Sequence, residues 1–135
     1  MRKIRYLIIH CSAVKPTQTS SARQIDAWHR AQGWRMIGYH YVVRRDGTIE
    51  RGRPDAMVGA HCSGHNQDSI GICYEGGLNL LGQPADTRTE TQRTAILSLI
   101  RQLKRKYPEA RIRGHNDFSP KACPCFEAEK EYRTV

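Results

Sequence analysis

Two histidines and one cysteine have side chains of the types that zinc prefers. All three lie at positions where the chain is expected to be rigid. His10 closes an apolar segment near the N-terminus, His115 follows a second one near the C-terminus, and Cys123 lies eight residues beyond His115. Catalytic zinc sites typically use three protein ligands and keep a fourth position open for water or substrate. These three residues are therefore a candidate catalytic zinc site.

Each of these residues also has a simpler structural interpretation. A single histidine at a strand end is commonly a hydrogen-bonded structural residue. Cys123 and Cys125 flank one proline and could pair, although a disulfide between residues two apart would close a strained ring. The metal interpretation therefore depends on the combination of ligand types, and it leaves Cys125 without an assigned role.

Two further residues could act beside a metal. Lys121 lies two residues before Cys123 and is a surface lysine by default, but an ammonium group there would stabilise negative charge on a substrate oxygen. Tyr39, in the segment GYHY, is either a packing residue or a phenol that orients a water molecule or passes a proton. Spacing alone does not decide between these roles.

The other histidines and cysteines carry weaker signals. His61 and His65 lie in a segment rich in glycine and could line a cleft, although a structural or solvated role is equally compatible with the sequence. Packing or surface positions are the expectation for the remainder: His29, His40, Cys11, Cys62 and Cys73.

The hydrophobic pattern predicts the elements that must position these residues. Apolar, β-branched runs at residues 4–10 and 69–74 are typical of strands buried on both faces. A cap at Ser20 or Ser21 begins a helix that runs to about Gln32, and the capping box of Thr89 begins another that runs to about Tyr107.

A hairpin and several shorter elements complete the prediction. Asp46 and Gly47 join two strands, with Tyr39, Tyr41 and Val43 expected on one face. After the hairpin, the pattern predicts a long irregular loop at 54–68. It also predicts a short strand at 110–113 and one more short helix at the chain end.

Composition bounds the class of protein. The chain has 135 residues and a net charge of +9, which predicts one α/β-type domain attracted to a polyanion such as nucleic acid, a membrane face or an acidic wall polymer. Five cysteines are an odd number, which favours a reducing compartment. The apolar run at residues 6–9 is shorter than the roughly 7–15 residues of a signal peptide core, so we expect cytoplasmic synthesis.

Four segments resemble, in order and spacing, the zinc-dependent N-acetylmuramoyl-L-alanine amidases of the bacteriophage T7 lysozyme type, which are related to peptidoglycan recognition proteins. The segments are IIHCSAVKP, DAWHRAQGWRMIGYHYVVRRDGTIERGR, VGAHCSGHNQDSIGICYEGG and RGHNDFSPKACPCF. The resemblance covers residues 7–126 and implies an α/β fold in which helices flank a central mixed β-sheet. It also implies a single amidase domain over residues 1–135, with one catalytic zinc ion in a surface cleft.

The resemblance assigns roles residue by residue. The three zinc ligands that it implies are His10, His115 and Cys123. Tyr39 matches the tyrosine beside the catalytic water, and Lys121 matches a lysine of the same site. His61 falls in a loop that borders the substrate groove. No acidic residue comes with these motifs, so the general base stays unassigned.

The activity implied is hydrolysis of the amide between N-acetylmuramic acid and L-alanine in bacterial peptidoglycan. The implied partners are peptidoglycan or muropeptides, with no specific nucleic acid and no membrane, and the enzyme would reach the wall through release or another delivery system. One alternative is a peptidoglycan-binding domain of the same fold without activity, which commonly lacks the thiolate ligand. A basic nucleic-acid-binding protein would need four closed zinc ligands and a concentrated basic face, and neither is evident.

Overall fold

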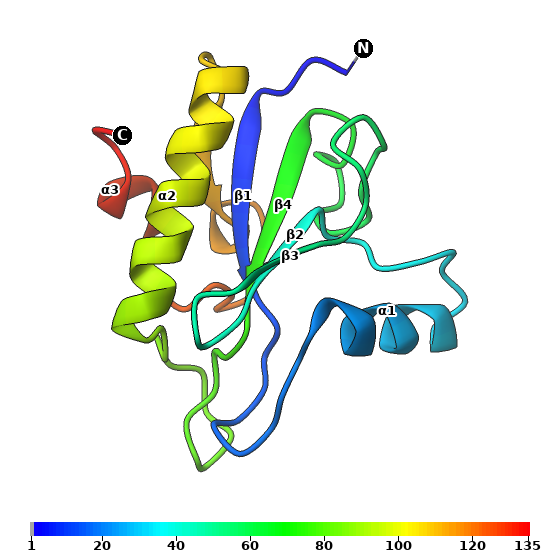
Figure 1. Cartoon of the computed structure of the whole chain (residues 1–135), viewed down its shortest axis with the longest axis vertical. Helices are drawn as coiled ribbons and strands as arrows, with labels where there is room; N and C mark the ends of the chain where they lie inside the picture. The colour runs from blue at the N-terminus through cyan, green and yellow to red at the C-terminus, as the bar shows by residue number, and fades with distance from the viewer. Residues whose placement is uncertain (1) are drawn as a thin grey trace.

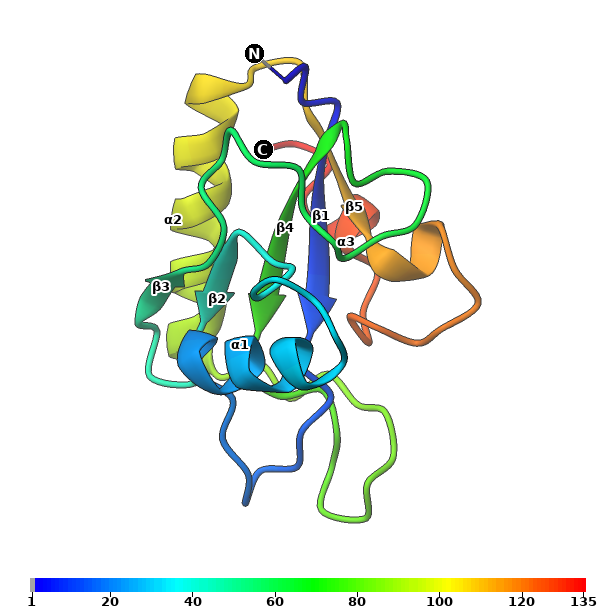
Figure 2. The ribbon, with the colours of Figure 1, turned by 90° about the vertical axis from the view of Figure 1, so that its right-hand side faces the viewer.

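Five strands form one mixed sheet in the computed structural model, which describes residues 2–135 (Figure 1). The strands are β1 (Tyr6–Cys11), β2 (Tyr41–Val43), β3 (Ile49–Arg51), β4 (Ser69–Tyr74) and β5 (Arg111–Gly114). Their spatial order is β3-β2-β4-β1-β5, as Figure 2 shows. Every neighbouring pair is parallel except β2 and β3, which form the predicted antiparallel hairpin. The expectation of a central mixed sheet is confirmed.

Helices cover both faces of this sheet. They are α1 (Ala22–Ala31), α2 (Glu90–Lys106) and α3 (Ala128–Glu131), with a 3-10 turn, η1 (His115–Asp117), after β5. Figure 1 shows α2 and α3 on one side of the sheet and α1 on the other. Both predicted caps are present as capping boxes, Ser21 with Gln24 and Thr89 with Gln92. None of the helices in residues 2–135 is long and apolar enough to span a bilayer.

Alternation along the buried strands separates two apolar clusters. Leu7 and Ile9 of β1 pack in the cluster that includes Ile96 and Ile100 of α2. The opposite face carries a smaller cluster made of Ile25, Ile37, Val42 and Cys73. Because successive side chains of a strand point to opposite faces, His10 lies on the face away from α2. That face, on the side of α1, holds the cleft described below.

The hairpin differs from its prediction in one respect that concerns Tyr39. The chain bends at Gly38 and His40, so β2 begins only at Tyr41. Tyr39 packs against the smaller cluster, whereas Tyr41 and Val43 belong to the cluster under α2. The prediction that these three residues share one face is therefore wrong, because the alternation of a regular strand does not extend through the bends.

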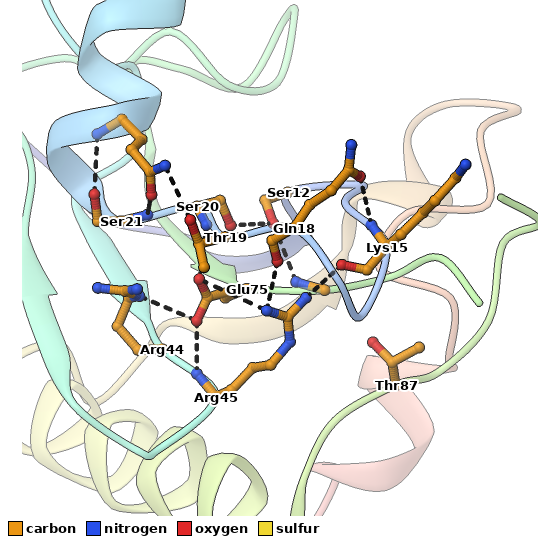
Figure 3. Close-up of polar contacts among 12 residues, drawn as sticks. Ser12, Lys15, Gln18, Thr19, Ser20, Ser21, Arg44, Arg45, Glu75 and Thr87 are labelled. Atoms are coloured by element: carbon orange, nitrogen blue, oxygen red, sulfur yellow. Dashed lines mark hydrogen bonds and ion pairs between the residues drawn. The ribbon is translucent and has the colours of Figure 1, made fainter. Parts of the chain in front are cut away.

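A buried carboxylate ties the end of β4 to the loop that follows β1. Glu75 accepts hydrogen bonds from the backbone N–H groups of Ser20 (2.7 Å) and Arg45 (2.9 Å), and from Nε of Arg44 at 3.0 Å (Figure 3). The Ser20 hydroxyl donates in turn to Ser12 Oγ at 2.6 Å. The loop that leaves the carboxyl end of β1 is thus fixed to the hairpin and to β4.

Candidate metal centre and cleft

His10 and His115 meet because β1 and β5 are adjacent parallel strands. Ile9 pairs with Gly114 in this register, so the residue that follows each of them lies at the same edge of the sheet. The imidazole ring centroids of His10 and His115 are 4.6 Å apart. Side chains at the carboxyl ends of parallel strands converge in this way, and the prediction that two strand ends would hold two imidazoles together is confirmed.

Cys123 joins the two histidines from the loop after η1. Its Sγ and one nitrogen of each imidazole all lie within 4.8 Å of one another. The backbone N–H of Cys11 donates to Cys123 Sγ at 3.1 Å, which fixes the position of the sulfur. Two imidazoles and one sulfur are ligand types that zinc prefers, and ligands around one tetrahedral zinc ion are about 3–4 Å apart. The donor set therefore fits a zinc ion after small side-chain movements.

Both imidazoles are held in the neutral form that metal binding requires. His10 is only 1% exposed, and this burial lowers its pKa well below the ordinary value of 6.5, with further lowering from His61 and His115. Burial also lowers the pKa of His115, and the charge of Lys121 adds to the effect. Near neutral pH each ring therefore offers a lone pair rather than a positive charge.

The three candidate ligands lie beside a cleft of about 550 Å³. Its lining includes His115, Tyr39, His61 and Lys121, together with the aromatic side chain of Trp34. A concave site of this size with a few convergent polar groups is typical of small-molecule binding sites. Four of the six residues singled out from the sequence thus line one cavity, and the other two, His10 and Cys123, adjoin it through His115.

Tyr39 and Lys121 approach the centre differently. The Tyr39 ring centroid is 5.0 Å from that of His10, and burial raises the pKa of the phenol well above 10.0, with further raising by the thiols of Cys73 and Cys123. The phenol therefore keeps its proton near neutral pH and is available as a hydrogen-bond donor. Lys121 is exposed, so its ammonium group stands at the solvent side of the cleft.

His61 makes a contact that the sequence did not reveal. Its Nδ1 lies 2.9 Å from His10 Nε2, and its Nε2 lies 3.2 Å from Ser69 Oγ. His61 lines the cleft, and it also contacts the candidate ligand His10 directly. His65, the other histidine of this loop, packs on Phe118 at 4.2 Å between ring centroids and is absent from the cleft lining.

The remaining histidines and thiols make structural contacts, as predicted, but His29 and Cys62 also line the cleft. His40 is fully buried and accepts a hydrogen bond from the backbone N–H of Gly71, and His29 accepts one from that of Gly38. All five cysteines are free thiols, which leaves no disulfide between Cys123 and Cys125. The Cys125 thiol donates to the carbonyl of Gly77 at 3.4 Å and is not part of the ligand set. Three thiols are buried: Cys11, Cys62 and Cys73.

Comparisons of sequence and structure point to one family. The family model of N-acetylmuramoyl-L-alanine amidase matches residues 1–126. The endolysin of Escherichia phage T7 is 42% identical over 124 residues, which are 92% of this chain and 82% of the relative. Peptidoglycan-recognition protein SC2 of Drosophila melanogaster is 30% identical and is matched over 73% of its length by 97% of this chain.

A solved enzyme structure has the same architecture. The endolysin N-acetylmuramoyl-L-alanine amidase LysCS of Clostridium intestinale superposes with a TM-score of 0.80 at 33% identity, over 91% of this chain and 76% of that one. Drosophila PGRP-LB also superposes with a TM-score of 0.80, at 26% identity, over 99% of this chain and 82% of that one. From its matched sequence and its fold, the chain belongs to the N-acetylmuramoyl-L-alanine amidase family.

Proposed function

We propose that this amidase is a zinc hydrolase, with His10, His115 and Cys123 as its ligands. It hydrolyses the amide that joins N-acetylmuramic acid to L-alanine in bacterial peptidoglycan. One observation carries the proposal for the metal: three ligand atoms of the types that zinc prefers lie within 4.8 Å of one another beside a substrate-sized cleft. The thiol among them also favours an enzyme over a domain that only binds peptidoglycan.

The ligand set defines the charge available for the reaction. Two neutral imidazoles and one thiolate would leave a bound Zn²⁺ with a net charge of about +1. When bound there, zinc would polarise the substrate carbonyl and activate a water molecule near neutral pH. The protein has to supply a fixed geometry, a further donor for the developing oxyanion, and orientation of the attacking water.

Lys121 and Tyr39 are suited to these two tasks. The Lys121 ammonium group, at the solvent side of the cleft, would approach the carbonyl oxygen of a bound substrate and stabilise its developing negative charge. The protonated Tyr39 phenol, close to His10, would hold the attacking water in line. The described residues that line the cleft include no carboxylate, so water orientation by a neutral donor is favoured over a carboxylate base.

The same proposal extends to the whole chain and to its surroundings. Residues 1–135 would form one amidase domain, since Ala128 and Tyr132, beyond the part that matches the family model, pack in the main core cluster. Peptidoglycan or muropeptides would be the partners, and the +9 charge suits an anionic wall. Synthesis in the cytoplasm, followed by release or delivery to the wall through another system, is supported by the similarity to phage endolysins.

A muropeptide digest with metal analysis tests this function. Purified protein with one zinc ion per chain is expected to release stem peptides with free L-alanine amino termini, detected by mass spectrometry. Chelation should stop the release, and added zinc should restore it. Zinc-loaded protein that releases no such peptide would contradict the reaction, whereas full activity in metal-free protein would contradict the role of zinc.

A further inference from the structure

A chain of hydrogen bonds leads away from the candidate metal centre into the protein. His10 Nε2 lies 2.9 Å from His61 Nδ1, and His61 Nε2 lies 3.2 Å from Ser69 Oγ. The Ser69 hydroxyl donates to the backbone carbonyl of His65 at 2.6 Å. Ser69 is fully buried, so the chain ends inside the protein rather than in solvent.

The His65 carbonyl at the end of this series of hydrogen bonds determines which group donates in each of them. A carbonyl can only accept, so the single hydroxyl hydrogen of Ser69 is committed to His65. Ser69 Oγ must then accept from His61, which places the His61 hydrogen on Nε2 and leaves Nδ1 with a lone pair. His61 Nδ1 in turn accepts from His10, so His10 carries its hydrogen on Nε2. The lone pair of His10 therefore lies on Nδ1.

The His61 ring has little freedom to leave this arrangement. A Cβ atom added at Gly59 or at Gly71 would lie 2.7 Å from atoms of the ring, so glycine at these two positions gives the ring its space. The backbone N–H of His61 donates to Asn66 Oδ1 at 2.9 Å, which fixes the loop on the other side. The rings of His61 and His10 meet edge to face, at an interplanar angle of 89°.

We propose that His61 is a positioning residue that holds His10 in the Nε2–H tautomer and directs His10 Nδ1 toward the metal. This inference rests on the proposed zinc site. Hydrogen-bond partners of metal-ligating histidines set the tautomer and ring orientation, and their loss typically weakens metal binding by roughly 10–100-fold. The role differs from contact with substrate, because His61 acts through a ligand that is already present before any substrate binds.

The tautomers are directly observable in the wild-type protein. Long-range ¹H–¹⁵N spectra of the imidazoles are expected to show hydrogen on Nε2 of both His10 and His61, in metal-free and in zinc-loaded protein alike. Zinc should shift Nδ1 of His10 and not its Nε2. A His10 ring that carries its hydrogen on Nδ1, or binds zinc through Nε2, overturns the proposal without any variant being made.

Two substitutions of His61 separate its contacts. In His61→Asn the side-chain Oδ1 occupies a position similar to the lost Nδ1 and can accept from His10, whereas in His61→Gln the amide reaches toward Ser69 instead. Zinc affinity, measured by competition with a chromophoric chelator, is expected to fall by roughly 10–100-fold in His61→Gln and to stay close to wild type in His61→Asn. Equal affinity in both variants and wild type overturns the inference.

The outcomes distinguish this inference from the proposed function. Wild-type protein that fails to bind one zinc ion per chain contradicts the zinc site, and with it the positioning role. Wild-type protein that binds zinc tightly, together with a His61→Gln variant of unchanged affinity, contradicts the positioning role alone. Thermal unfolding of the metal-free variants shows whether a loss of affinity merely reflects a loss of folded protein.

Discussion

The backbone N–H of Cys11 donates a hydrogen bond of 3.1 Å to the sulfur of Cys123, which lies 112 residues later in the chain. The contact connects the last residue of β1 to the loop after η1, next to the two candidate histidine ligands. Because the donor belongs to a strand in the middle of the sheet, its position is rigid. The candidate thiolate is thus oriented by the fold, whereas the Cys125 thiol, two residues further on, donates to the carbonyl of Gly77.

The two thiols of this loop are expected to respond differently to the same substitution. Cys123→Ser removes a zinc ligand, so zinc content should fall well below one per chain. kcat/KM should drop by about 100-fold or more, because Lewis-acid assistance is worth several kcal/mol and each tenfold corresponds to about 1.4 kcal/mol. Zinc analysis and a muropeptide assay on the same preparation measure both effects.

Cys125→Ser is the matched control for that experiment. The Cys125 thiol contacts the Gly77 carbonyl rather than the ligand set, and a serine hydroxyl can donate to the same acceptor. Zinc content and kcat/KM are expected to stay close to wild type. Loss of zinc from Cys125→Ser with retention in Cys123→Ser would mean that the wrong thiol has been assigned.

Tyr39→Phe is expected to lower kcat while leaving the fold and the metal in place. The substitution keeps the ring that packs against the apolar cluster on the side of α1 and removes only the hydroxyl. If the phenol orients the attacking water or passes a proton, kcat should fall by about 100-fold or more. Zinc content and thermal unfolding of the same sample are the controls. Unchanged kcat in the variant would assign Tyr39 to packing alone.

Lys121→Met is expected to reduce kcat with little effect on KM. Loss of one preorganised donor to a developing oxyanion typically costs about 100–1000-fold in kcat. The Lys121 side chain is exposed, so the substitution should leave the thermal unfolding midpoint unchanged. Steady-state kinetics on a defined muropeptide separate kcat from KM.

An exposed lysine of α3 provides the control for charge. Lys130→Met lowers the net charge by the same one unit but lies outside the cleft lining. Its kcat should equal that of wild type. Equal losses in both variants would show that Lys121 contributes through the overall attraction of an anionic substrate and not through the reacting carbonyl.

The parts of the site that the sequence predicts are those determined by local pattern. His10 and His115 each follow an apolar, β-branched run, and parallel neighbouring strands bring such ends together. The contact between His61 and His10 could not be predicted in this way. It depends on the path of an irregular loop without periodicity, and on the space left by Gly71 in a strand paired with β1. No local signal in the sequence encodes such packing.

The sheet face on which Tyr39 lies is a second feature that the local sequence pattern does not predict. Period-two alternation assumes a regular strand, and the bends at Gly38 and His40 interrupt it just before β2 begins at Tyr41. The hydrogen bond from the His40 N–H goes to the Gly71 carbonyl, so the course of this segment is set by β4. The same deviation is what brings Tyr39 to the cleft.

Glu75 is expected to make the stability of the fold depend on pH in the acid range. Burial alone would raise its pKa, but hydrogen bonds from Arg44 and from the amides of Ser20 and Arg45 outweigh this effect and hold the pKa below the ordinary 4.5. A carboxyl group whose pKa is lowered by folding stabilises the native state above its unfolded pKa. That contribution is lost as the pH falls through the folded pKa.

The substitution Glu75→Gln tests this contribution. At pH 7 the free energy of unfolding, measured with urea, should fall by about 1–3 kcal/mol, because hydrogen bonds to a buried charged group are weakened and Arg44 keeps only Glu50 as a charged partner. The difference from wild type should shrink as the pH falls below 4.5, and it should be smallest below the lower pKa of the folded state, where wild-type Glu75 is protonated as well. Glu129→Gln, which removes a partly exposed partner of Arg133, should change the stability far less at pH 7. A difference between Glu75→Gln and wild type that stays constant from pH 7 into the acid range would mean that the carboxylate charge does not stabilise the loop after β1.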